Sequence, residues 1–188
     1  MPVQQLVDDI AGAIRSVDQS GIPFKEFRPG AGPYGEPQLV KLIAGYLVSK
    51  CGDRYSGART CRNPDVLIPG KWALEFKIVR PFGDNDREAE NWSQNLLHPY
   101  PGNVSSIGDA IKLLARDGPE QRGVIVICYE HEPPKIDLLR LVEAFELISR
   151  QLLGLPLGDR CSAMLRDCVH PVHKRTTVFG WSLHAAQG

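Results

Sequence analysis

Residues 63 to 77, Asn-Pro-Asp-Val-Leu-Ile-Pro-Gly-Lys-Trp-Ala-Leu-Glu-Phe-Lys, are the stretch that decides the expected fold. Its two apolar runs, 66–68 and 72–79, are rich in the β-branched and aromatic residues that favour strands. Between them, Pro69-Gly70-Lys71 has turn chemistry, because proline fixes φ and glycine readily takes a positive φ. The sequence therefore predicts an antiparallel hairpin whose loop is residues 69–71.

The length of this loop determines which residues face each other across the hairpin. In the predicted register Ile68 faces Trp72. Counting back along the two strands then places Asp65 opposite Glu75, with Cβ atoms about 4.5–5.5 Å apart. Lys77 follows Glu75 by two residues and therefore lies on the same face of its strand. A slip of one residue would put the two carboxylates on opposite faces, so the prediction depends on this register.

Two carboxylates and a lysine on one face indicate hydrolysis of a phosphodiester. Facing carboxylates repel each other, and the repulsion drives one of them towards protonation. A divalent cation removes the repulsion, since Mg²⁺ prefers hard oxygen ligands. A neighbouring lysine can orient or help to activate a water, or stabilise charge on a phosphate. The alternative is structural: Asp65 ends a loop, while Glu75 and Lys77 form the solvated face of an edge strand.

Pro64-Asp65, followed by Glu75-Phe76-Lys77, resembles the PD-(D/E)xK signature of the restriction-endonuclease-like nucleases. The gap of nine residues between Asp65 and Glu75 is at the short end of that pattern. The resemblance implies an α/β fold in which a mixed central sheet is flanked by helices on both faces. It also implies a Mg²⁺-dependent DNA endonuclease similar to type II restriction endonucleases, with Mn²⁺ as a substitute and products that carry a 5′-phosphate.

The resemblance further implies a role for each residue of the motif. Asp65, Glu75 and the backbone carbonyl of Phe76 would bind the metal, and Lys77 would position the attacking water and help to deprotonate it. Many relatives carry an acidic residue on the helix before the hairpin, and Glu36 is the candidate in this chain. The alternative for Glu36 is a favourable interaction with the dipole of the helix that it begins. Duplex DNA is the implied partner, and many relatives dimerise to cut both strands.

The charge of the chain is balanced as a whole but uneven along its length. The net charge is zero at pH 7, which does not by itself indicate nucleic-acid binding. Residues 50–80, however, hold seven basic and three acidic residues. Such a local excess fits a phosphate substrate bound at one site, although unevenness of this size also arises by chance. The candidate contacts with nucleic acid are Arg59, Arg62, Lys71, Arg80 and Asn103.

Composition indicates a single domain, residues 1–188, of ordinary size. Of the 188 residues, 43% are hydrophobic, which is enough to build a core. No apolar run approaches the ~18–20 residues of a membrane span, and the first residues lack the pattern of a secretory signal. Five widely spaced cysteines without a C-x-x-C pair suit a reducing compartment. We therefore expect a cytoplasmic protein.

Hydrophobic periodicity predicts the elements around the hairpin. Helical spacing is found at residues 2–19, from residue 36 to about residue 50, from residue 105 or 106 onward, and at 136–153. Strands are expected at residues 55–60, 123–129 and 176–183. The run at 123–129 is apolar throughout, which predicts a strand buried on both faces and therefore helices on both sides of the sheet.

Two polar segments have open interpretations. The stretch 81–104, with a short helix around residues 87–97, is expected to be an insertion or lid over the site. The glycine-rich stretch 28–35 either lets the backbone approach a ligand or is a simple connection.

A second group of reactive side chains lies near the end of the chain. Cys161, Cys168, His170 and His173 form the pattern C-x6-C-x-H-x2-H, and all four residue types bind zinc. The spacing does not match a usual zinc motif, so buried cysteines beside a partly exposed basic loop are the other interpretation. The second functional hypothesis for the whole chain is a catalytically silent nuclease-like fold that binds nucleic acid or a protein.

Overall fold

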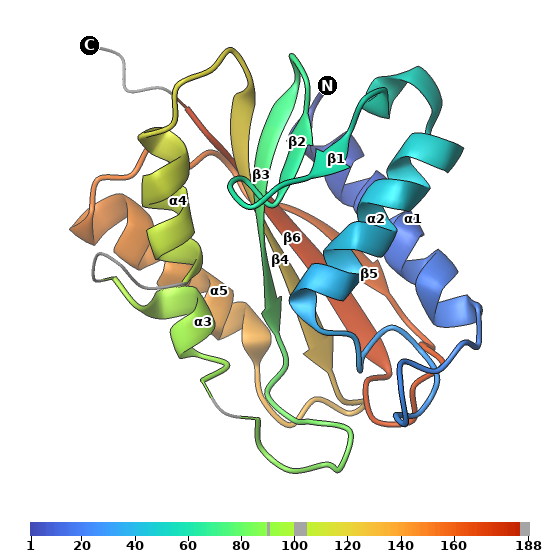
Figure 1. Ribbon diagram of the computed structural model, residues 1–188. Helices are drawn as coiled ribbons and strands as arrows, with labels where there is room; N and C mark the ends of the chain where they lie inside the picture. The colour runs from blue at the N-terminus through green and yellow to red at the C-terminus, as the bar shows by residue number, and fades with distance from the viewer. Residues whose placement is uncertain (90, 100–104, 185–188) are drawn as a thin grey trace.

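The computed structural model describes residues 1–89, 91–99 and 105–184 (Figure 1). The helices are α1 (Val3–Gln19), α2 (Glu36–Lys50), α3 (Gln94–Leu97), α4 (Ser106–Leu114) and α5 (Leu138–Leu147). A 3₁₀ turn, η1 (Gly52–Tyr55), follows α2, and a π-helical turn, η2 (Ile148–Leu152), continues α5. The strands are β1 (Arg59–Thr60), β2 (Val66–Ile68), β3 (Trp72–Val79), β4 (Gln121–Glu130), β5 (Cys161–Leu165) and β6 (Arg175–Leu183).

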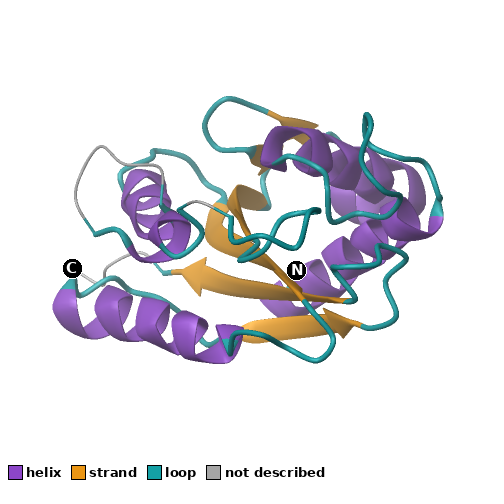
Figure 2. Ribbon diagram, turned by 90° about the horizontal axis from the view of Figure 1, so that it is seen from below, coloured by secondary structure: helices purple, strands orange, loops and turns teal. Residues whose placement is uncertain are grey.

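These strands form one mixed sheet in the order β1-β2-β3-β4-β6-β5. Strands β3 and β4 are parallel neighbours, and the other described neighbours are antiparallel. Helices α1 and α2 cover one face of the sheet, and α3, α4 and α5 cover the other (Figures 1 and 2). The predicted mixed α/β class, with helices on both faces, is therefore confirmed.

Strand β3 lies inside the sheet, and all eight of its residues are buried. Its large apolar side chains pack into the core under α1 and α2, whereas Ala73 and Val79 pack into the core under α4 and α5. Because side chains alternate along a strand, Glu75 and Lys77 share the face of Ala73 and Val79. Two charged side chains are thus buried on the face that α4 covers.

The predicted hairpin register is confirmed. Strands β2 and β3 pair with Ile68 opposite Trp72, and the amide of Lys71 donates to the carbonyl of Ile68 at 2.9 Å to close the loop. Gly70 has a φ of 66°, a left-handed conformation that glycine adopts without strain. The residue before β2, Asp65, is therefore placed on the same face as Glu75, as predicted.

The predicted elements with strong periodicity are also found, whereas weakly patterned segments differ. The strand expected at residues 55–60 is only the two-residue β1, because η1 and Gly57, with a φ of 73°, turn the chain before it. The helix expected around residues 87–97 is reduced to α3, and the helix expected at 136–153 ends in the π-helical turn η2. Strand β5 was not predicted.

None of the described helices is long and apolar enough to cross a membrane. The five cysteines are all free thiols. The described strands belong to one sheet, and each face of that sheet packs against one hydrophobic core.

Candidate active site

The carboxylates of Asp65 and Glu36 bind the edge of β3 that extends beyond its pairing with β2. The amide of Phe76 donates to Asp65 Oδ2 at 2.8 Å, and the amide of Ile78 donates to Glu36 Oε2 at 3.1 Å. These bonds occupy the positions that a longer β2 would use for its ladder, so buried amides of β3 stay paired. Both carboxylates are thereby held against the strand that carries Glu75 and Lys77.

Asp65 and Glu75 lie against each other across the hairpin. Glu75 is only 7% exposed, and its carboxyl group hydrogen bonds to that of Asp65. Burial, together with the nearby charge of Asp65, raises the pKa of Glu75 to about 9. The repulsion expected from the sequence is therefore present, and Glu75 relieves it by staying protonated at neutral pH.

Lys77 is held between two carboxylates on different helices. Its Nζ lies 3.4 Å from Glu36 Oε1 at the start of α2 and 3.2 Å from Asp109 Oδ2 in α4. Burial disfavours the charged ammonium, but these two carboxylates outweigh burial and raise the pKa of Lys77. The lysine is therefore kept protonated, which suits hydrogen-bond donation and charge stabilisation better than taking a proton from water.

The contacts of Glu36 connect α2 to the hairpin. Its carboxylate contacts Lys77 and the amide of Ile78 on β3, although it also stands in the first turn of α2. Burial raises the pKa of Glu36, while Lys77 partly offsets that effect. Glu36 therefore lies beside the charged group of β3, and its place in the first turn of α2 also fits the helix-dipole interpretation.

Asp109 is the site residue that sequence reasoning missed. It is 5% exposed, in the first turn of α4, and its Oδ1 also binds Lys112 Nζ at 2.8 Å. The available signal was weak: an acid three residues before a lysine on a helix is usually a solvated pair. The fold instead turns Asp109 inward, and it bridges the buried Lys77 to the half-exposed Lys112.

A cavity of about 220 Å³ opens beside the carboxylates. Glu36 and Asp65 form part of its wall, together with Lys41 of α2 and Thr60 of β1. The two carboxylates therefore reach open space between α2 and the β1 edge of the sheet. Glu75 and Lys77 do not line this cavity.

The residues predicted to contact nucleic acid do not all reach this site. Lys71 donates to two backbone carbonyls of η1, at 2.7 and 3.0 Å, and so fixes that turn against the hairpin loop. Arg80 donates to backbone carbonyls of the glycine-rich loop before α2. Both cations therefore have a structural use within the chain. Arg59 and Arg62 are exposed beside β2, and Asn103 lies outside the described residues.

The four predicted zinc ligands are not brought together. His170 and His173 stack with ring centroids 4.6 Å apart, and each bonds through Nε2 to the segment that follows β3. Cys161 lies apart on β5, and Cys168 contacts a threonine hydroxyl of β6. Across residues 1–89, 91–99 and 105–184, no group of three or more His, Cys, Asp or Glu side chains could hold a metal ion. The other interpretation, buried cysteines beside a partly exposed basic loop, is confirmed in part. Cys168 is buried, and Lys174 and Arg175 are partly exposed, but Cys161 is only partly buried and both histidines are buried.

Comparison of the chain with protein-family models, with curated proteins and with solved structures gives no match. The likeness carried by Pro64-Asp65 and Glu75-Phe76-Lys77 therefore stays a prediction. A functional proposal rests on the geometry and chemistry of the site itself.

Proposed function

We propose that this protein is a Mg²⁺-dependent endodeoxyribonuclease with a restriction-endonuclease-like fold. The observation that carries the proposal is the contact between Asp65 and Glu75, with Lys77 two residues beyond Glu75 on the same face of β3. Placing the carboxyl groups of Asp65 and Glu75 in contact, on the strand that also buries Lys77, costs folding free energy that a purely structural hairpin would avoid. A site that binds a cation and a phosphate gives this arrangement a use.

The oxygen atoms of the hairpin suit a hard divalent cation. Glu75 holds a proton at neutral pH that a cation would replace. The amide and carbonyl of one strand residue point to the same edge, and the amide of Phe76 reaches Asp65. The Phe76 carbonyl therefore also points to that edge. Asp65, Glu75 and this carbonyl are the groups that would hold Mg²⁺, with water completing its shell.

Bound Mg²⁺ would act as a Lewis acid on the phosphate and lower the pKa of a bound water. The rest of the work falls to side chains of the chain. Lys77, kept charged by Glu36 and Asp109, donates to the water or to the phosphate and stabilises negative charge. Lys112, bound to Asp109 and 41% exposed at its side chain, adds a second positive charge towards solvent.

Phosphates of the substrate have one further basic neighbour at the open edge of the sheet. Arg59 of β1 lies opposite Leu67 of β2, so both side chains are on the same face. Asp65 precedes Leu67 by two residues and shares this face. An exposed arginine on the carboxylate side of the sheet supports binding of a nucleic-acid backbone there.

The second candidate function is a catalytically silent nuclease-like fold that binds nucleic acid or a protein partner. Such a protein would not need Asp65, Glu75 and Lys77 together. All three are present: Asp65 contacts Glu75, Lys77 contacts Glu36 and Asp109, and the two groups are close enough for the charge of Asp109 to act on Glu75 and that of Asp65 to act on Glu36. This arrangement favours the enzyme.

Cleavage of plasmid DNA tests the proposal directly. We expect the protein to cut supercoiled plasmid in Mg²⁺ but not in EDTA. Asp65→Ala should lower the rate at least about a hundredfold. It removes one of the two facing carboxylates and also the acceptor of the hydrogen bond from the Phe76 amide. Asp117→Ala changes an exposed aspartate on the turn after α4 and is the matched control. Equal cutting by all three proteins would remove the basis of the proposal.

The proton that Glu75 keeps at neutral pH predicts how cation binding depends on pH. Because the pKa of Glu75 is raised to about 9, a cation must displace a proton when it binds at neutral pH. Affinity for Mn²⁺ should therefore rise about tenfold per pH unit between about pH 6 and pH 8. Calorimetric titration in buffers with different ionisation enthalpies measures the release, which should be about one proton for the wild type. Affinity that does not change with pH would count against Glu75 as a ligand.

A further inference from the structure

The loop of residues 82–87 follows β3 and lies at the same end of the sheet as the glycine-rich loop 28–35 (Figure 1). A cavity of about 320 Å³ lies between the two loops, so they pack on each other only in part. Among the described residues, the hydrogen bonds and ion pairs that join loop 82–87 to other segments end on one lysine and three histidines: Lys135, His131, His170 and His173.

His170 and His173 connect this loop to the segment that precedes β6. They are 0% and 2% exposed, and their rings stack on each other. His170 Nε2 contacts the carboxylate of Asp84, and His173 Nε2 lies 2.9 Å from the carbonyl of Phe82. The carboxylate and the carbonyl are both acceptors, so Nε2 carries the ring proton in each histidine.

The other ring nitrogen of each histidine is not placed to take a second proton. His170 Nδ1 accepts from the amides of Val172 and His173, at 3.2 and 3.1 Å. His173 Nδ1 is buried without a hydrogen-bond partner in the described part of the chain, and it lies so close to Gly32 that an added Cβ would be 2.1 Å from it. A proton on His170 Nδ1 would break two backbone hydrogen bonds, and one on His173 Nδ1 would be a buried donor without an acceptor. The arrangement therefore fits neutral rings.

The charges around the histidines do not reverse this preference. The titratable and charged groups that face the three rings are Asp18, Arg28, Arg80, Asp84, Asp86, Tyr129 and Lys135. Burial is the largest effect at each ring and lowers the pKa of all three histidines, that of His173 to about 4. At His170 the carboxylates of Asp84 and Asp18 oppose burial, whereas Arg28 adds to it. At His173 the guanidinium of Arg80 and the neighbouring histidines add to it.

We propose that His170 and His173 form a latch that releases loop 82–87 when the solution becomes acidic. Histidine is the side chain whose charge ordinarily changes between about pH 5 and pH 8. Once released, the rings regain water and their ordinary pKa of 6.5, so below that pH the released state binds more protons than the latched state. The latch is therefore fully closed above about pH 6.5 and weakens as the pH falls below this value.

Release of the loop would open the cavity between loops 82–87 and 28–35. Pro33, three residues before α2 begins, lines that cavity together with Gly83 and Asp84 of the loop. The latch thus controls access to the end of the sheet where α2 begins. It does not depend on the proposed nuclease activity.

Hydrogen exchange followed by nuclear magnetic resonance tests the latch in the wild-type chain. The amide of Val172 is bonded to neutral His170, and the amide of Gly83 donates to the carbonyl of Arg87 within the loop at 2.8 Å. After correction for the intrinsic exchange rate, protection of both amides should fall at least about tenfold between pH 7 and pH 5.5. The amide of Val126, in the middle of β4, should keep its protection. Unchanged protection at Val172 or Gly83, or an equal loss at Val126, overturns the proposal.

Variants that keep the hydrogen bonds but do not titrate isolate the two histidines. In His173→Gln the side-chain amide can still donate to the Phe82 carbonyl, and in His170→Asn the side-chain oxygen can still accept from the Val172 amide. The double variant should lose most of the pH response, with a change of less than about threefold.

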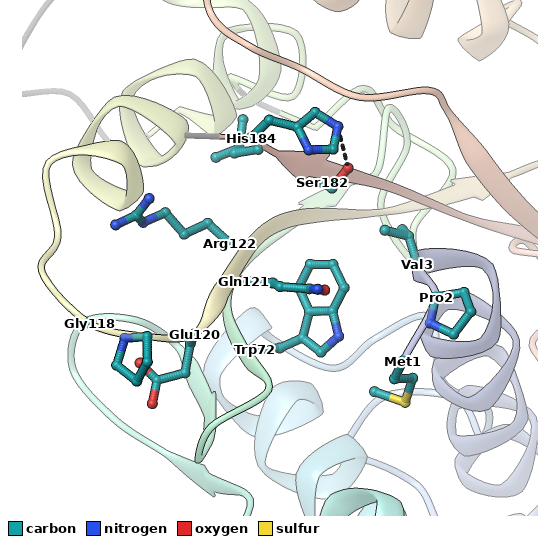
Figure 3. A pocket seen from close by; sticks show the side chains of 12 residues that line it. Met1, Pro2, Val3, Trp72, Gly118, Glu120, Gln121, Arg122, Ser182 and His184 are labelled. Atoms are coloured by element: carbon teal, nitrogen blue, oxygen red, sulfur yellow. Dashed lines mark hydrogen bonds between the residues drawn. The ribbon is translucent and has the colours of Figure 1, made fainter. Parts of the chain in front are cut away.

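His184→Gln is the matched control. His184 is exposed and lies just after β6 beside Ser182, on the wall of a separate cavity (Figure 3). This variant should respond to pH like the wild type. A full response in the double variant, or a lost response in His184→Gln, would contradict the latch. The comparison of Val172 and Gly83 with Val126 uses the wild-type chain, so it decides the question even where a variant folds poorly.

Discussion

Glu75→Gln is expected to stabilise the protein at alkaline pH while lowering Mg²⁺-dependent cleavage about 10³-fold. The pKa of Glu75 is raised from 4.5 to about 9, so the folded chain binds one more proton than the unfolded chain between these values. The free energy of unfolding of the wild type must therefore fall as pH rises through this window. Glutamine has the same size, stays neutral and can donate to Asp65. We expect the variant to be about 1–2 kcal/mol more stable at pH 8 and nearly unchanged at pH 4.

Urea unfolding in EDTA at both pH values measures this difference, with Glu26→Gln, an exposed residue, as the control. Addition of Mn²⁺ then shows whether Glu75 binds the cation or only destabilises the folded chain when it ionises. The wild type should gain stability from the cation, because only the folded chain holds both carboxylates together. Glu75→Gln should gain none. A variant that is less stable than the wild type at pH 8, or equally stabilised by Mn²⁺, would contradict the assignment of Glu75.

The hairpin shows how much of such a site can be predicted locally. Turn chemistry at residues 69–71 and the apolar runs on either side determine the register, because any slip would expose buried side chains. The relative positions of Asp65, Glu75 and Lys77 follow from that register. Local sequence could not decide the role of Glu36, since its contact with Lys77 depends on where α2 begins relative to β3.

The parts that could not be predicted depend on contacts between distant segments. Asp109 belongs to the site only because α4 packs on β3 and turns its first acid inward. Lys71 and Arg80 were sensible candidates by charge, but the fold gives each of them backbone carbonyls to bind. Strand β5 was missed because it lies at the edge of the sheet, with alternately exposed residues that resemble a loop.

Lys77→Met is expected to lower Mg²⁺-dependent cleavage about 10³-fold, because it removes the donor that faces the phosphate. Methionine keeps much of the length of the side chain without its charge. Asp109 keeps Lys112 as a partner and Glu36 keeps the amide of Ile78, so the fold should persist. Cleavage assays with circular dichroism measure both effects. Lys77→Arg should restore part of the rate, since it restores the charge, and Lys50→Ala on the exposed end of α2 is the neutral control. Wild-type cleavage by Lys77→Met would contradict its role.

Asp109→Asn tests whether the charge on Lys77 is the property that matters. Asp109 and Glu36 together raise the pKa of Lys77 against its burial, so loss of the Asp109 charge must lower that pKa. The alkaline decline of the cleavage rate should then move to lower pH in Asp109→Asn. Lys112→Ala removes the other partner of Asp109 but leaves Lys77 paired, so its pH profile should match the wild type with a reduction in rate of about tenfold or less. If Asp109→Asn lowers the rate equally at every pH, Asp109 only supports the packing of α4, and the positive charge of Lys77 does not depend on it.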